Sequence, residues 1–124
     1  MTAGGWLELQ DAGTHNGHLT IVLHGDLAIA TVPALEESLR PRIAEDPTCR
    51  RITLDLSGLD FIDSTGLAAI VLVSRLCAKH GVEFELLPGR RSVQRLFEFS
   101  GLVEALPFRD EGLAGEPGMP RSKG

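Results

Sequence analysis

Hydrophobic and polar positions first alternate along this chain in the manner of a β-hairpin. A short alternating segment begins at Trp6, and residues 19–24 are rich in β-forming side chains. Between them, Asn16-Gly17 is a two-residue signal for a tight turn that reverses the chain. The two segments are therefore expected to be strands that pair antiparallel.

The spacing of apolar residues then changes to a helical period in three segments. The first helix has Thr31 as its expected N-cap, because a hydroxyl can accept from the free backbone N–H groups of a first turn. The second helix follows Asp63 and ends near Gly81. The third runs from Ser92, its expected cap, to Phe99.

Strands alternate with these helices. Residues 51–56 and 82–87 have the composition of strands, and strand–helix–strand units form parallel pairs with right-handed crossovers. We therefore expect an α/β domain whose mixed, mostly parallel sheet is opened by the antiparallel hairpin, with helices packed against it. If the strands before them are neighbours, the loops at 26–31 and 60–65 lie on one rim of the sheet.

Length and composition match one globular domain with its own core. The chain has 124 residues, of which 43% are hydrophobic and 23% charged. The domain is expected over residues 1–109, followed at 110–124 by a flexible C-terminal tail rich in Gly, Pro and Ser. The net charge of −5 argues against nucleic-acid or membrane partners, because both need clustered cations.

The sequence contains no set of residues typical of an enzyme. It has no phosphate-binding glycine loop and no nucleophile elbow, and Cys49 and Cys77 lie in no metal-binding or redox motif. We expect no catalytic residues, no metal, no cofactor and free thiols. The N-terminus shows no secretion signal, and we expect a cytoplasmic protein.

The most informative segment is 54–67, where a buried-type strand leads into a long apolar helix. Asp60 and Asp63 are expected in the loop between them, together with the hydroxyls of Ser64 and Thr65. Hydroxyls there face unpaired N–H groups and the positive end of the helix dipole, and a phosphate would make this surface strongly anionic. The local pattern alone favours a simpler role, in which Asp63 or Ser64 only caps the helix.

One face of the long helix combines polar and apolar residues. Leu72 shares this face with Arg75 and Lys79. Together with Thr65 and Ala68, Leu72 would extend the loop into a half-apolar patch able to dock a partner. A single exposed Leu is also common on protein surfaces, which leaves an ordinary solvent-exposed side chain as the alternative.

Three segments together resemble the STAS domain and, within it, the bacterial anti-sigma factor antagonists. They are Gly25-Asp26-Leu27, the strand at 52–57, and Phe61-Ile62-Asp63-Ser64-Thr65-Gly66-Leu67. The resemblance covers about residues 7–108. It makes a phosphorylation switch the favoured interpretation over a simple cap.

The resemblance implies a protein that binds an anti-sigma factor serine/threonine kinase and thereby frees the sigma factor. The kinase would phosphorylate Ser64, and a serine phosphatase would restore it. The loop after Gly25 corresponds to the second contact region of the family, although Ala28 stands where the family commonly has a second acid. The implied partner-binding residues are Asp26, Leu27, Asp60, Asp63, Ser64, Thr65, Gly66, Ala68 and Leu72.

Two other functions of STAS domains stay open at this point. In the first, the domain is a permanent scaffold subunit of a lipid-transport or stress-signalling complex, and Ser64 need not be phosphorylated and dephosphorylated. In the second, it binds a small molecule such as a nucleotide or a fatty acid, although the sequence offers no pocket signature. Stable co-purification with a transporter ATPase, and with no kinase, would support the scaffold.

Overall fold

The N-terminal hairpin forms as the sequence predicts. A computed structural model describes residues 5–109, in which β1 (Leu7–His15) and β2 (His18–Leu27) pair antiparallel. The turn holds Asn16 at φ 53° and Gly17 at φ 81°, the left-handed conformations that a two-residue hairpin needs and that Asn and Gly adopt most readily. The tail expected at 110–124 lies outside the described residues.

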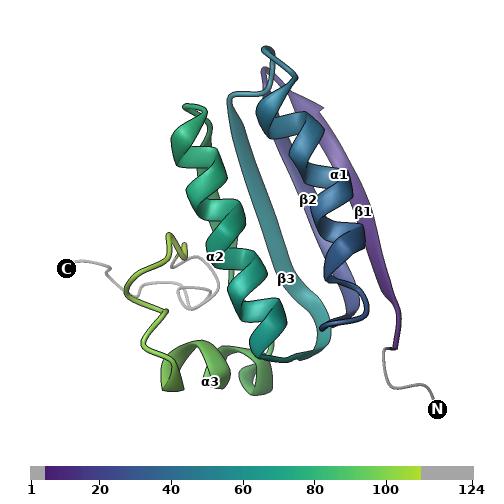
Figure 1. Ribbon diagram of the computed structural model, residues 1–124, viewed down its shortest axis with the longest axis vertical. Coiled ribbons are helices and arrows are strands. Elements are labelled where there is room, and N and C mark those ends of the chain that lie inside the picture. Colours follow the sequence, from purple (N-terminus) through teal and green to yellow (C-terminus); the bar gives the residue numbers. More distant parts are fainter. Residues whose placement is uncertain (1–4, 110–124) are drawn as a thin grey trace, which may run out of the picture.

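The four strands form one mixed sheet in the order β1-β2-β3-β4. β2, β3 (Arg51–Ile62) and β4 (Glu83–Leu87) pair parallel, through crossovers that contain α1 (Val32–Ala44) and α2 (Ser64–Lys79). These two helices lie side by side over one face of the sheet, and α3 (Arg91–Phe99) lies near the start of α2 (Figure 1). The predicted fold class is confirmed.

β2 shows how the core is built. Its side chains alternate between half-buried and buried along the whole strand, because one face of the sheet packs against the helices and the other does not. Each fully buried aliphatic or aromatic side chain contributes about 1.5–3 kcal/mol relative to exposure. The fully buried side chains include Leu19, Leu23, Leu35, Leu39, Leu54, Leu56, Ile70 and Phe97.

β3 is longer than predicted. It continues past residue 56 to Ile62, because two irregularities in the pairing with β2, one between Asp55 and Gly58 and one at Asp60, each accommodate one extra residue on β3. Asp60 therefore lies in the strand, and its expected position in a loop is wrong.

Two expected helix caps are formed differently. α3 begins at Arg91 without a side-chain cap, so the Ser92 cap is wrong. Thr31 occupies the N-cap position of α1, but its hydroxyl makes no cap bond. That hydroxyl instead donates to the Asp26 carbonyl at 2.7 Å and accepts from the Ala28 N–H at 3.0 Å, which closes the β2–α1 loop.

The segment after α3 returns to the sheet. Residues 103–107 form turns, and Phe108 makes an isolated parallel bridge with Leu86 of β4. The ring of Phe108 also packs edge-on against Phe97, with ring centroids 5.0 Å apart. Within residues 5–109, no helix is both long and apolar enough to cross a membrane.

Candidate functional site

The junction between β3 and α2 consists of a single residue, Asp63. Its backbone is extended, with φ at −113°, and its Oδ1 accepts from the Gly66 N–H at 2.9 Å. This bond satisfies one of the four free N–H groups at the start of α2. The expectation that Asp63 caps the helix is therefore confirmed.

The second oxygen of Asp63 reaches the neighbouring loop. Oδ2 accepts from the Ile29 N–H at 3.2 Å, and the Asp63 N–H donates to the Leu27 carbonyl at 3.3 Å. The loops after β2 and β3 thus meet at one end of the sheet (Figure 1), as predicted for neighbouring parallel strands. One carboxylate fixes the start of α2 and the β2–α1 loop relative to each other.

Leu27 and Gly66 lie inside this junction. Leu27 has no exposed surface. A Cβ added to Gly66 would lie 2.2 Å from the Leu27 carbonyl oxygen, so only glycine fits this close approach of helix to strand. Both residues were expected to contact a partner. They are buried and pack against each other beneath the exposed start of α2.

The exposed part of the site follows one row along α2. Ser64 is the first residue of the helix and is exposed, and Ala68 and Leu72 follow at intervals of four residues on the same face. Among the described residues, the Ser64 hydroxyl has no hydrogen-bond partner. Thr65 is half-buried. Of the two residues that carry hydroxyls at the start of α2, Ser64 is the more exposed.

Two exposed hydrophobic residues beside Ser64 were missed in the sequence analysis. Ile29 in the β2–α1 loop is 71% exposed, and Phe61 near the end of β3 is 51% exposed. With Leu72, which is 54% exposed, they form what we call the apolar collar (Ile29, Phe61, Leu72). The sequence signal for Ile29 was a large aliphatic residue in a connecting loop, where a polar residue is usual.

The carboxylates expected in the site have different surroundings. Asp60 forms an ion pair with Arg90 at 3.4 Å, and both side chains are more than half exposed, so the pair contributes at most about 1 kcal/mol. Asp26 is half-buried, and its side chain packs against Gly5. Ala28, where the family commonly has an acid, is only 6% exposed.

The described residues offer no set of metal ligands. Within 5–109, no three His, Cys, Asp or Glu side chains gather into a possible site. Cys49 and Cys77 are free, and burial raises the pKa of the Cys77 thiol to about 12. Burial also raises the pKa of Cys49. Both thiols are protonated near neutral pH and are therefore poor nucleophiles.

Comparison with known proteins identifies the family of most of the chain. The family model of the STAS domain matches residues 10–111. The anti-sigma-B factor antagonist of Staphylococcus aureus is 32% identical over 93 residues, which cover 75% of this chain and 84% of that protein.

Solved structures share the fold. An anti-sigma factor antagonist from Mycobacterium paratuberculosis matches with a TM-score of 0.73 and 23% identity, over 89% of this chain and 93% of that one. Phosphorylated SpoIIAA of Bacillus matches with a TM-score of 0.64 and 21% identity, over 86% and 96% of the two chains. The family match and the Staphylococcus relative go further than the fold: this chain belongs to the STAS domain family and, within it, to the anti-sigma factor antagonists.

Proposed function

We propose that this protein binds an anti-sigma factor serine kinase, so that the sigma factor is released, and that phosphorylation of Ser64 ends this binding. The observation that carries the proposal is the exposed hydroxyl of Ser64, which has no partner among the described residues and stands at the first position of α2. The protein acts in the cytoplasm by binding alone, and a serine phosphatase returns it to the binding form.

The apolar collar supports a protein partner for this surface. Its three large side chains are more than half exposed. Ile29 and Phe61 lie in the segments that meet at the start of α2, and Leu72 lies two turns along the helix. Solvent-exposed hydrophobic groups of this kind anchor protein interfaces when a partner covers them. Ile29 is hydrogen-bonded to Asp63, the residue before Ser64, and Phe61 is three residues before Ser64. A kinase that covers these two side chains therefore also reaches the hydroxyl.

A phosphate on Ser64 would act mainly on the interface. It adds about −1.5 to −2 charges near neutral pH, close to the carboxylate of Asp63 and two turns from Leu72. Burying that charge under a partner costs free energy unless cations pair with it. The start of α2 stabilises the phosphate, and Asp63 already caps the helix, so the fold survives while binding is lost.

The existence of a phosphorylated form of Bacillus SpoIIAA supports the switch by analogy, because that protein shares the fold. Its identity to this chain is 21%, so the position of the modified residue in this chain rests on the exposure and chemistry of Ser64. Thr65 is the neighbouring hydroxyl, and its half-burial makes it the poorer substrate.

A pull-down from the source cell tests the proposal. Wild type, Ser64→Asp and Ser92→Asp are used as baits, and captured proteins and the phosphorylation state of Ser64 are identified by mass spectrometry. Ser92 is an exposed serine in the first turn of α3, so Ser92→Asp is a matched control for adding a carboxylate at a helix start.

The expected result is capture of an ATP-binding kinase by wild type and by Ser92→Asp, with loss of capture by Ser64→Asp. Ser64→Ala should bind the kinase and resist phosphorylation. If all baits retain the same transporter or scaffold complex and Ser64 is never phosphorylated, the switch is excluded and the protein is a permanent subunit.

A further inference from the structure

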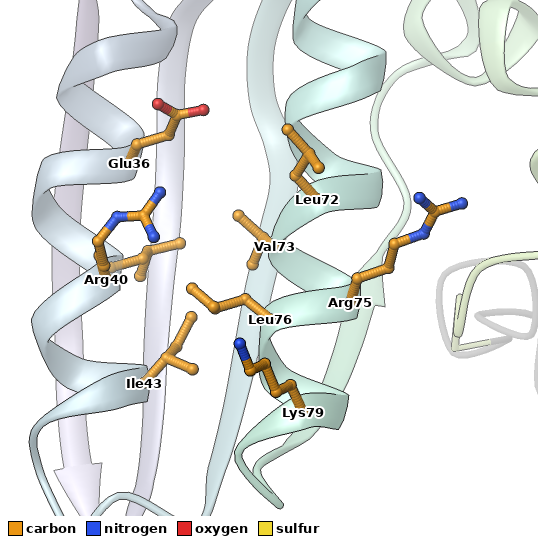
Figure 2. A pocket seen from close by; sticks show the side chains of 9 residues that line it. Glu36, Arg40, Ile43, Leu72, Val73, Arg75, Leu76 and Lys79 are labelled. Carbon is orange, nitrogen blue, oxygen red and sulfur yellow. The ribbon is translucent and has the colours of Figure 1, made fainter.

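A groove between α1 and α2 extends away from Ser64 and shares Leu72 with the apolar collar. Its volume is about 250 Å³. Among the groove residues, Leu39 and Ile43 of α1 are spaced four apart, as are Leu72 and Leu76 of α2, so each pair lies on one face of its helix. Its apolar lining consists of the buried side chains of Leu39, Ile43 and Val73, together with the exposed Leu72 and the half-buried Leu76. Figure 2 shows Ile43, Leu72, Val73 and Leu76 between the two helices.

The rim of the groove is mainly basic. Figure 2 shows the side chains of Arg40 and Lys79 directed toward the groove from opposite helices, while that of Arg75 extends away from it. Within residues 5–109, neither Arg40 nor Lys79 takes part in an ion pair. Glu36 is the acidic residue of the rim and lies at the end nearest Leu72. In a chain with a net charge of −5, this is a local surface that attracts acidic groups.

The dimensions of the groove decide between a small molecule and a protein segment. Small-molecule sites usually enclose about 300–1,000 Å³, more than the 250 Å³ found here. The lining residues extend from Glu36 to Ile43 of α1, which corresponds to about 10 Å, or two helical turns. A channel of this length between two helices suits the apolar anchors of a third helix.

We propose that this groove binds an amphipathic helix of a partner protein. The apolar stripe of that helix packs on the exposed side chain of Leu72 and the half-buried side chain of Leu76. Its acidic residues pair with Arg40 and Lys79. The contact does not depend on the state of Ser64. Leu72, the nearest groove residue on α2, is eight residues from Ser64, or about 12 Å, and salt screens charges beyond about 8–10 Å.

The test uses the full chain and designed peptides of about 18 residues, long enough to form a helix. One peptide has a leucine stripe flanked by glutamates, and its partner peptide has lysines in place of the glutamates. Dodecanoate serves as the small amphiphile. Binding is followed by NMR shifts of backbone amides, which report both the affinity and the residues affected.

The glutamate peptide is expected to shift amides of α1 and α2 along the groove, with a dissociation constant below 1 mM. The double variant R40E/K79E should weaken this binding about tenfold or more and should strengthen binding of the lysine peptide. R91E/R95E makes the same change of charge on exposed residues of α3, and it should leave binding of the glutamate peptide unchanged. Thermal unfolding checks that both variants are folded.

Two results would overturn the inference. One is equal binding of the glutamate peptide by R40E/K79E and R91E/R95E; the other is saturation of the groove by dodecanoate when neither peptide binds. Ser64→Asp should bind the glutamate peptide as wild type does. Because this measurement contains no kinase, its outcome is independent of whether Ser64 is a phosphorylation site.

Discussion

α2 and α3 both carry an exposed serine in their first turn, but the two helix starts are supported differently. Ser64 follows Asp63, whose carboxylate accepts from the N–H groups of Gly66 and Ile29. Ser92 lies in a helix whose N-cap, Arg90, makes no side-chain cap bond. Both residues are serines in the first turn of a helix. They differ in that a neighbouring carboxylate, that of Asp63, holds the start of α2 by hydrogen bonds, whereas no side chain does so at the start of α3.

This difference explains why one serine is suited to recognition. A hydroxyl that must fit the active site of another protein benefits from a fixed backbone position. The segment that carries it is then already ordered in the free protein, so binding does not have to supply that free energy. Ser64 has such a position and lies beside the apolar collar. The anchoring of α2 can be broken in several ways, and the same changes at other positions provide the comparison.

Gly66→Ala should have the largest effect. The added Cβ would lie 2.2 Å from the Leu27 carbonyl oxygen, and backbone must move to relieve the clash, so we expect a loss of about 3 kcal/mol or a failure to fold. Urea unfolding measures the change. Gly81→Ala is the control: Gly81 has φ at +74° with open space around its Cβ position, which costs only about 1–2 kcal/mol. Equal losses in both variants would contradict the close-packing role of Gly66.

Asp63→Ala removes the acceptor for two backbone N–H groups. We expect it to lower the free energy of unfolding by about 1–2 kcal/mol. Arg90→Ala changes the equivalent N-cap of α3, where no side-chain cap exists. It removes only the exposed ion pair with Asp60 and should lower stability by less than about 1 kcal/mol. If the two variants unfold at the same urea concentration, α2 is not anchored as described.

Ile29→Ser tests the apolar collar by binding. The side chain is 71% exposed, so stability should change little, while affinity for the captured kinase should fall by about 1 kcal/mol or more, as for an interface anchor. Phe99→Ser removes a 78% exposed side chain from the end of α3, in the hollow that Phe61 also lines, and an equal loss of affinity there would extend the interface to α3. Titration calorimetry with the purified kinase distinguishes them, and an unchanged affinity in Ile29→Ser would remove Ile29 from the interface.

Ser64→Asp and Ser92→Asp should have the smallest effect on stability, and a similar one. Each adds a negative charge at a helix start, which stabilises a helix by about 0.3–1 kcal/mol. Thermal unfolding of both variants measures it. A marked destabilisation by Ser64→Asp alone would mean that any loss of kinase binding reflects damage to the fold.

The parts of the fold that depend on local chemistry could be predicted from the sequence. The turn at Asn16-Gly17 requires two left-handed residues in succession, and the cap at Asp63 requires only a carboxylate next to a first turn. The length of β3 could not be predicted, because the bulges that carry it to Ile62 depend on its pairing with β2.

The residues of the candidate site that lie on α2 could be predicted from the sequence, but those on the neighbouring segments only in part. The row from Ser64 to Leu72 follows from helical spacing. The link from Asp63 to Ile29 joins residues 34 apart in the sequence, and the exposure of Ile29 and Phe61 is a property of the packed molecule. The groove likewise requires two helices to lie side by side, which no single helical pattern contains.

Both edges of the sheet are protected against joining another sheet. On β1, the register against β2 shifts between Asp11 and Gly13, so Ala12 is an unpaired extra residue that bends the edge strand. On β4, Phe108 covers the other edge through its bridge to Leu86. Open strand edges are templates for aggregation, and bulges and covering segments are the usual protection. The bulge and the bridge therefore reduce the chance that the sheet of one molecule pairs edge to edge with that of another.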